Sequence, residues 1–467
     1  MIDPYPTIDE FRAGTLDIDC RRMSLRRSDG SEFAGPGHIR MDDQRNLVFT
    51  IYSDTPSKSL RQHFEEFTKV RAGEVYTDEM LYELEAVADD GTVWRADKLL
   101  PPSVSSRTSG TSVDIVSGRT DRLAAEVQTG RTGHAVELTF FEELPLPANE
   151  WTENNSGRTL DTAKFELDGR TLTFRAAPGS SQTTATAESS APLPPNFDYR
   201  LQETVQYVTG KPTLYSACIR ITGSEGSLEL GNGWPVPAAT HLDPPLHGPS
   251  FRHGSDGIRL MRDFLNYVTR TENGTLWNYL SYQIFTAAVA SAGSIDSWAL
   301  GLGVAVEAIA ELIEIPTQPA EEAKLATFLV QLIAVIDGDS RFGEFRERAR
   351  NHVRSMSSRR AKDTLHYLAG LGRVADEYVS AWGKLRNRQA HPKPIKSDTY
   401  QREAQKLFVL IRKIQTLMWQ LTFHLIGYEG NFTDYGKQDG QTFPTAAYPL
   451  AVPSTASQSS DTETPAS

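Results

Sequence analysis

The first half of the chain alternates apolar and polar residues over short segments. Because successive side chains of a strand point to opposite faces, this period of two predicts β-strands. A hairpin is clearest where Asp168 and Gly169 separate two alternating runs, since this pair supplies the positive φ angles of a type I′ turn. The segments predicted as strands are 15–20, 47–52, 81–88 with 93–94, 135–141, 165–174, 215–222 and 227–230.

Many short strands with polar turns are typical of a β-sandwich or an open barrel, so residues 1–235 are predicted to form a β-rich domain. Two stretches within it, 101–120 and 177–195, are rich in Ser, Thr, Pro and Ala, and we expect mobile loops there. Prolines recur between positions 235 and 249 and exclude a continuous helix or central strand. Residues 236–256 are therefore interpreted as a Pro-rich linker.

From residue 256 onward apolar residues recur every three or four positions, which predicts α-helices. They form a predicted all-α domain over residues 257–430, and residues 431–467 are predicted to be a disordered tail. The expected fold class is α+β in several domains, with a β-rich sandwich or barrel-like domain followed by a helical bundle. The expected helices are 257–272, 276–292, 296–314, 319–336, 342–354, 361–390 with a break near Gly370 or Gly372, and 398–426.

Composition points to a cytoplasmic protein without a metal or other cofactor. The first residues contain neither a basic segment nor an apolar run, and the two cysteines match no disulfide framework or metal-binding spacing. His241, His247 and His253 recur at intervals of six, which fits neither a helical pair of ligands nor a zinc finger, so they are interpreted as part of the linker. Residues 273–295 carry no charge, but their polar side chains would be costly in hydrocarbon, and we expect a buried helix rather than a membrane span.

Charge is distributed unevenly along the chain. Residues 341–416 contain 18 Lys or Arg and 7 Asp or Glu, a formal charge of +11, whereas the whole chain carries −12. A positive field of this kind attracts a polyanion. The alternative is a solvated helix face that partly neutralises an acidic protein.

The candidate site lies within this basic segment. Apolar residues at Leu371, Val374 or Ala375, Tyr378, Trp382 and Leu385 fall on one face of a helix. Pro392 disfavours helical geometry at the residue before it, so the helix should end there. Arg386 and Asn387 are then expected in the last turn, with His391 just beyond it.

The run Arg-Asn-x-x-x-His, preceded by Trp-x-x-Leu and closed by Ala-His-Pro, resembles the ribonuclease motif of the HEPN superfamily. Within it, the chain is most similar to the Apea-like HEPN proteins of bacterial anti-phage and abortive-infection systems. Glu307, in Val-Ala-Val-Glu-Ala-Ile on an upstream helix, also matches that pattern. The resemblance covers about residues 295–427 and is only general over the first half. It implies a homodimer with a composite site at its interface, which cleaves RNA and leaves a 2′,3′-cyclic phosphate.

These residue types suit phosphodiester cleavage. Histidine transfers protons near neutral pH because its ordinary pKa is about 6.5, which makes His391 the expected acid or base. Arg386 stays charged and offers a planar fork to phosphate oxygens, and Asn387 can orient the phosphate or the histidine. The cycle needs both an acid and a base, so a single motif histidine in each chain favours a two-fold dimer. No metal is required.

Other residues are assigned supporting roles. Glu307 is the expected partner of a motif arginine, with an orienting role, because it lies on a largely apolar helix and a buried carboxylate needs such a partner. Lys384, Arg388 and Lys393 are the expected RNA-binding cations. The aromatic residues near the motif are interpreted as core residues rather than base-stacking groups; they are Tyr282, Trp298 and Trp382.

The leading hypothesis is a metal-independent endoribonuclease acting on RNA, with tRNA among the candidate substrates. Its β-rich half would sense a trigger, such as a phage-derived one, or bind a regulatory partner. The alternative is a non-catalytic HEPN scaffold or a module that binds RNA or a nucleotide, in which Arg386 pairs with a carboxylate and His391 caps the helix end. A glycan-binding protein is a third interpretation, but the β-rich half lacks a supporting set of aromatic residues.

Overall fold

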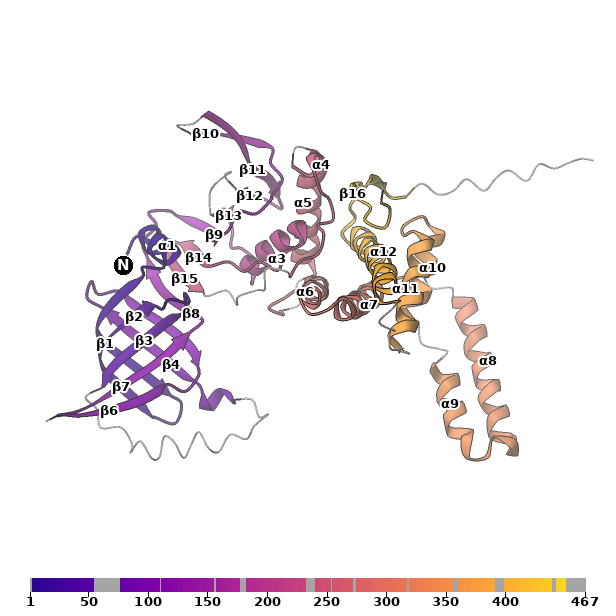
Figure 1. The fold of residues 1–467 in the computed structure, drawn as a ribbon, viewed down its shortest axis with the longest axis horizontal. Helices are drawn as coiled ribbons and strands as arrows, with labels where there is room; N and C mark the ends of the chain where they lie inside the picture. Colours follow the sequence, from indigo (N-terminus) through magenta and orange to yellow (C-terminus); the bar gives the residue numbers. More distant parts are fainter. Residues whose placement is uncertain are drawn as a thin grey trace, which may run out of the picture. The chain divides into compact units, whose positions relative to one another are not determined.

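The computed structural model of this chain has an α+β fold that divides into two compact units (Figure 1). The first unit comprises Met1–Ala238 and Gly248–Asn278, and the second comprises Ala239–His247 and Tyr279–Ser467. The predicted combination of a β-rich first half with a helical second half is confirmed. The residues that the structure describes are 2–53, 76–109, 111–154, 157–176, 182–231, 240–252, 254–271, 274–316, 319–355, 360–390, 399–438 and 442–450.

The described strands of the first unit form a single 15-stranded antiparallel sheet in the order β10-β11-β12-β13-β9-β14-β15-β8-β5-β4-β1-β2-β3-β7-β6. Its two end strands, β10 and β6, do not pair with each other, so the described sheet does not close into a barrel. The strands are β1 (Asp17–Arg27), β2 (Glu32–Met41), β3 (Leu47–Ser53), β4 (Tyr82–Ala88), β5 (Val93–Leu99), β6 (Ser103–Ser109), β7 (Thr111–Thr120), β8 (Arg122–Val127), β9 (Gly133–Phe140), β10 (Glu150–Asn154), β11 (Gly157–Leu167), β12 (Arg170–Arg175), β13 (Thr183–Ser189), β14 (Ala217–Gly223) and β15 (Glu225–Gly231).

The predicted hairpins are confirmed. Asp168 and Gly169 have φ angles of 49° and 74° and connect β11 to β12, with Leu167 opposite Arg170. These angles are those that a two-residue type I′ turn requires. The turn after β4 also forms as expected, with Thr92 donating its backbone N–H to Asp90 Oδ1 at 2.8 Å.

The loop predictions for 101–120 and 177–195 are wrong for residues 103–109, 111–120 and 183–189, which are strands, whereas residues 190–195 belong to no helix or strand. Strands β6 and β7 occupy most of the first stretch, and β13 occupies 183–189 in the second. In β13 the small residues Ala185 and Ala187 are fully buried and alternate with threonines. The strand does not need large apolar side chains, because its backbone hydrogen bonds to β12 and β9 keep it in the sheet while the small alanines are buried.

A buried helix in the first unit was not predicted. The residues of α3 (Phe197–Thr209) are buried on every face, including Arg200, Glu203 and Gln206. Their polar atoms find internal partners: the Arg200 guanidinium donates to both Glu203 carboxylate oxygens at 2.8 and 2.9 Å, and Gln206 Nε2 donates to the Thr213 carbonyl at 2.7 Å. Phe197, Leu201, Val205 and Val208 recur at helical spacing, but the polar residues between them give no sign in the sequence that they are buried. The other helices of this unit are α1 (Pro4–Ala13), η1 (Asp78–Met80), α4 (Pro249–Arg252) and α5 (Ser255–Arg270).

The helices of the second unit agree with the predicted order. The predicted break near Gly370 or Gly372 separates α10 from α11, and Gly427 ends α12 with a φ angle of 68°. None of the described helices combines the length and apolar run needed to cross a bilayer. The helices are α6 (Tyr279–Ser291), α7 (Ile295–Glu311), α8 (Pro319–Gly338), η2 (Ser340–Phe345), α9 (Arg346–Ser355), α10 (Ala361–Gly370), α11 (Asp376–Ala390) and α12 (Tyr400–Ile426).

Helix α7 lies at the centre of the second unit and packs against α6, α10, α11 and α12. Close approach to α6 depends on Gly301, because a Cβ there would lie 2.6 Å from the Ala290 methyl group. The buried face of α12 carries the predicted apolar stripe, including Leu407, Ile411 and Met418. Helices α8 and α9 pack against each other around Leu329, Ile336 and Val353.

Two predicted boundaries differ from the structure. Residues 240–247 are not a free linker, since the Asp243 carbonyl accepts hydrogen bonds from Gln415 Nε2 at 2.9 Å and Trp419 Nε1 at 3.2 Å on α12. Helix α5, which the sequence assigned to the helical domain, belongs to the first unit, where Phe264 stacks on Tyr207 at 4.0 Å between ring centroids.

The predicted tail, 431–467, is ordered in its described part. Strands β16 (Gly430–Thr433) and β17 (Thr445–Tyr448) form a hairpin whose aromatic residues pack on Phe423 of α12. The buried Asp434 accepts a hydrogen bond from the Tyr378 hydroxyl at 2.5 Å. Scattered aromatic residues, rather than a periodic pattern, hold this segment in place, which is why periodicity does not reveal it. Residues 451–467 lie outside the described part.

Candidate active site

Helix α11 carries the candidate arginine and is held against α7 by its apolar face. Val374, Tyr378, Trp382 and Leu385 are all buried, which confirms the predicted stripe except at Leu371, which is exposed. The indole Nε1 of Trp382 donates a hydrogen bond to the Gly303 carbonyl of α7 at 3.2 Å. This contact fixes the register between the two helices.

The ion pair of the site follows from this register. Arg386 lies one turn after Trp382, and Glu307 lies one turn after Gly303, so each occupies the next position on its helix face. Arg386 Nη2 donates to Glu307 Oε1 at 2.9 Å. The predicted pairing of Glu307 with a motif arginine is confirmed.

Trp382 also contacts the arginine directly. The Arg386 guanidinium carbon lies 5.5 Å from the centre of the Trp382 ring, within the range of a cation–π interaction. The Arg386 and Glu307 side chains are 54% and 34% exposed, respectively. The bond to Glu307 uses one of five guanidinium N–H donors, so a half-exposed Arg386 can be oriented by protein and still contact a bound phosphate.

The remaining predicted site residues are distributed around the end of α11. Asn387 is exposed. Arg388 Nη1 lies 4.0 Å from Glu403 Oε2 on α12. Lys384 lies on the α12 side of the helix. His391 and Lys393 lie outside the described residues, so their positions relative to Arg386 stay predictions.

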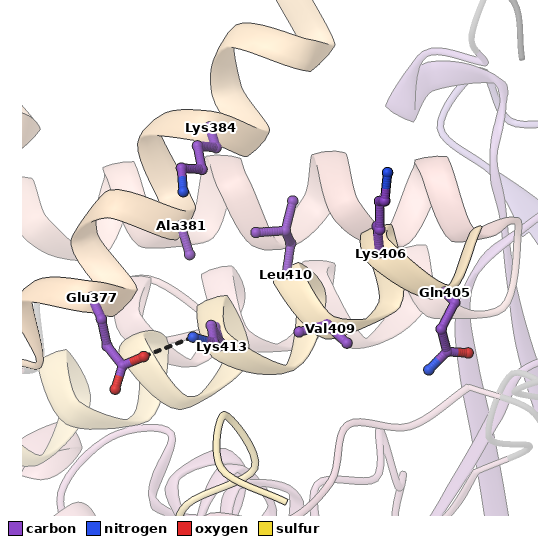
Figure 2. Close-up of a pocket in the computed structure, with 8 residues that line it drawn as sticks. All are labelled: Glu377, Ala381, Lys384, Gln405, Lys406, Val409, Leu410 and Lys413. Carbon is purple, nitrogen blue, oxygen red and sulfur yellow. Dashed lines mark hydrogen bonds and ion pairs between the residues drawn. The ribbon is translucent and has the colours of Figure 1, made fainter. Parts of the chain in front are cut away.

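Sequence reasoning missed a groove between α11 and α12 (Figure 2). Its volume is about 390 Å³. Lysines from both helices line it together with the apolar side chains Ala381, Val409 and Leu410. Lys413 Nζ donates a hydrogen bond to Glu377 Oε2 at 2.7 Å. The only indication of this groove in the sequence is the positive charge of residues 341–416, and that charge does not show which lysines come together in the fold. The lining residues are Glu377, Ala381, Lys384, Gln405, Lys406, Val409, Leu410 and Lys413.

The aromatic residues near the motif differ from one another. Trp382 is a core residue, as expected. Trp298 is partly buried and meets the Phe408 ring edge-on at 6.0 Å. Tyr282 is exposed, so its interpretation as a core residue is wrong. Tyr279 on the same helix, α6, is exposed as well. Exposed apolar side chains are common at protein surfaces, so the apolar character of Tyr282 did not determine its burial.

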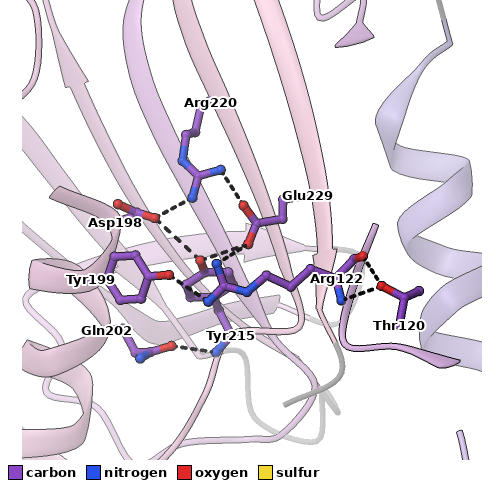
Figure 3. A network of polar contacts seen from close by, with 8 residues as sticks. All are labelled: Thr120, Arg122, Asp198, Tyr199, Gln202, Tyr215, Arg220 and Glu229. Atoms are coloured by element: carbon purple, nitrogen blue, oxygen red, sulfur yellow. Dashed lines mark hydrogen bonds and ion pairs between the residues drawn. The ribbon is translucent and has the colours of Figure 1, made fainter. Parts of the chain in front are cut away.

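The first unit contains a network of charged residues that the sequence did not reveal (Figure 3). Arg220 contacts Asp198 at 2.5 Å and Glu229 at 2.9 Å, and Arg122 contacts Glu229 at 3.3 Å. The Tyr215 hydroxyl donates to Glu229 at 3.3 Å. Burial and neighbouring negative charges raise the pKa of Tyr215 far above its ordinary value, so the hydroxyl stays protonated and acts as a donor. The network joins α3 to β14, β15 and the start of β8.

Neither cysteine is positioned for catalysis. Cys20 and Cys218 are both free and buried. Burial, reinforced by nearby aspartates, raises the pKa of Cys20 to about 12, and burial also raises the pKa of Cys218. Within the described ranges, no three His, Cys, Asp or Glu side chains lie close enough together to bind one metal ion.

Comparisons with family models, with curated proteins and with solved structures found no match for this chain. The likeness to HEPN proteins therefore rests on the motif residues, and any functional assignment must come from the geometry around Arg386.

Proposed function

We propose that this protein is a metal-independent endoribonuclease of the HEPN type that acts as a homodimer. The proposed substrate is RNA in the cytoplasm, with tRNA among the candidates, and the proposed role is anti-phage defence by abortive infection. The first unit would regulate cleavage by binding a phage-derived trigger or a regulatory partner. The observation that carries the proposal is the arrangement of Trp382, Glu307 and Arg386, which orients an accessible arginine in the motif.

The accessibility of Arg386 favours an enzyme over a scaffold. The Arg386 side chain is half exposed, so its guanidinium can reach a bound phosphate, whereas an arginine enclosed in the bundle could not. Two contacts restrict it, the carboxylate of Glu307 and the ring of Trp382. A cation with a fixed direction and an open side is suited to a phosphate whose negative charge increases during reaction.

The proposed reaction is an internal transfer of the phosphodiester. A histidine takes the proton of the 2′-hydroxyl, the 2′-oxygen bonds to phosphorus, and the bond from phosphorus to the 5′-oxygen breaks. A second histidine protonates that leaving oxygen, which yields a 2′,3′-cyclic phosphate and a 5′-hydroxyl. His391 of each of two protomers would supply the two proton-transfer groups, and Arg386 would stabilise the charged phosphate.

The proposed dimer has a physical basis beside the site. Leu300, Val304 and Glu307 are spaced by four and three positions, so they lie on one face of α7. Leu300 and Val304 are each 52% exposed. Exposed aliphatic side chains next to a charged site gain free energy when a second copy covers them.

The proposed activity is tested with a 5′-labelled RNA incubated with excess EDTA. Wild-type protein should cleave it and leave cyclic phosphate ends, and His391→Ala should reduce cleavage by at least about 100-fold, the range of a lost general acid or base. Circular dichroism checks that the variant is folded. Cleavage by His391→Ala at the wild-type rate, or a strict requirement for Mg²⁺, would contradict the proposed chemistry.

Mass photometry tests the proposed dimer. Leu300→Glu/Val304→Glu should be monomeric and inactive, because two charges would have to be buried for the copies to meet. For wild type, activity per chain should fall once the protein is diluted below its dimer dissociation constant. Constant specific activity in a monomeric sample would refute a composite site.

A further inference from the structure

The groove between α11 and α12 lies on the side of α11 away from the ion pair. Successive residues of a helix are rotated by about 100° around its axis. Lys384 and Arg386 are two positions apart, so their side chains point in nearly opposite directions. Arg386 faces α7, where it meets Glu307, and Lys384 faces α12, where it lines the groove. The groove is therefore a separate site on the same helix (Figure 2).

The charge around this groove is unbalanced. Five cations from the two helices lie in or beside it, whereas two carboxylates, Glu377 and Glu403, pair with them. Glu377 bonds to Lys413, and Glu403 bonds to Lys406 at 2.9 Å. These seven residues carry a net charge of +3. The five cations are Lys384, Arg388, Arg402, Lys406 and Lys413.

The spacing of the lysines indicates a ligand with several negative groups. Lys406 and Lys413 are seven residues apart on α12, which corresponds to about 10 Å along the helix. Lys384 stands on the opposite wall (Figure 2). One phosphate or carboxylate cannot contact all three. A chain of phosphates can.

The floor of the groove is apolar. It consists of Ala381, Val409 and Leu410, whose side chains neither donate nor accept hydrogen bonds, and Gln405 is the one neutral polar side chain in the lining. A volume of about 390 Å³ is at the lower end for a ligand pocket. Lysines without a polar floor are suited to backbone contacts that hold a strand without regard to sequence.

We propose that the α11–α12 groove binds the sugar–phosphate backbone of a single-stranded nucleic acid, through Lys384, Lys406 and Lys413. The strand held in this way would be the RNA that the motif cleaves, so its identity as RNA rests on the proposed function. Arg386 lies two residues further along α11 but on its other side, so a strand held in the groove would have to continue past the end of α11 to reach it.

The test uses the full-length protein and a fluorescent 2′-O-methyl oligonucleotide, which binds but has no 2′-hydroxyl to react. Affinity is measured by fluorescence anisotropy between 50 and 200 mM salt. Each phosphate contact of a single strand contributes about 0.7 to the slope of log affinity against log salt. Lys384→Gln/Lys406→Gln/Lys413→Gln should therefore lower the slope by about 2 and weaken binding by about tenfold or more at the low salt concentration.

A matched control carries the same change in net charge elsewhere. Lys164, Lys211 and Lys362 are exposed and lie outside the groove, so Lys164→Gln/Lys211→Gln/Lys362→Gln should bind like wild type. Equal losses of oligonucleotide affinity in both triple variants would overturn the proposal, because the overall charge of the protein would then account for binding. Tighter binding of poly-glutamate than of the oligonucleotide would also overturn it, in favour of an acidic protein partner.

The outcomes separate this inference from the proposed ribonuclease activity. Groove-dependent binding without cleavage of unmodified RNA would support the groove and refute the activity. Cleavage at the wild-type rate, with wild-type affinity, in the groove variant would refute the groove and leave the activity supported.

Discussion

Replacing Glu307 with alanine separates the stabilising value of the site's ion pair from its positioning value. The Arg386–Glu307 bond is 2.9 Å long, but its two side chains are 54% and 34% exposed. Exposed ion pairs contribute about 0.2–1 kcal/mol, so Glu307→Ala should lower the free energy of unfolding by less than about 1 kcal/mol. In contrast, RNA cleavage should fall about 100-fold, because a misplacement of about 1 Å in a catalytic group costs that much. The loss should be in kcat rather than KM, since Arg386 keeps its charge.

Two further variants make this measurement decisive. Glu307→Gln keeps an oxygen that accepts the Arg386 hydrogen bond, so it should recover part of the lost kcat. Asp337→Ala removes a comparably exposed carboxylate from the Asp337–Arg350 pair of α8 and α9, where the side chains are 39% and 31% exposed. It should cost similar stability and no activity. Equal loss of kcat in the Glu307 and Asp337 variants, or no loss in either, would refute a positioning role.

Three other outcomes follow from the structure. Arg386→Lys should lose more than about tenfold in cleavage rate, since a lysine cannot reproduce the bidentate fork, and near-normal turnover would reduce Arg386 to a surface cation. Arg220→Met should lower the unfolding free energy by about 3 kcal/mol, since it leaves the carboxylate of Asp198 buried without its cation. The double variant Arg220→Met/Asp198→Asn should recover part of the lost stability. Hydrogen exchange of β14 measures both effects. Iodoacetamide at pH 8 should leave native Cys20 and Cys218 unmodified, because about 1 in 10,000 Cys20 thiols is ionised at a pKa of about 12, and mass spectrometry would detect any rapid labelling that contradicts this.

The buried face of α11 could be predicted from the sequence because its determinant is local. An apolar stripe every three or four residues fixed which face of α11 is buried, and this face includes Trp382. Glu307 was recognisable as a carboxylate on an otherwise apolar helix, for which a cation is the expected partner. The groove could not be predicted in the same way. Lys406 and Lys413 become neighbours of Lys384 only when α11 and α12 pack, and spacing along one helix carries no information on the facing one.

The fold of the first unit shows where alternation and periodicity fail. Helix α3 is enclosed on all sides, so Arg200 and Glu203 look like surface residues although they neutralise each other in the interior. Strand β13 looks like a loop because threonine and alanine dominate it, yet Ala185 and Ala187 pack at zero exposure. In both cases an element that packs against the segment is distant in sequence: α5 and β9 for α3, and β9 for β13. Hydrophobicity within a window cannot show such a partner.

The geometry of α11 argues against the alternative that its positive charge only forms a solvated helix face. Arg388 lies one turn after Lys384 and therefore on the same side, where it meets Glu403 of α12. Arg386 lies between them in sequence but on the opposite side, next to Glu307. Carboxylates thus meet the cations of α11 on both sides, and on the α12 side they are too few to neutralise them. Charge kept for solubility would not need two packed walls and an apolar floor. An excess of lysines over a groove is the arrangement that a phosphate chain stabilises, and it lies on the helix whose other face orients the arginine proposed to act on that chain.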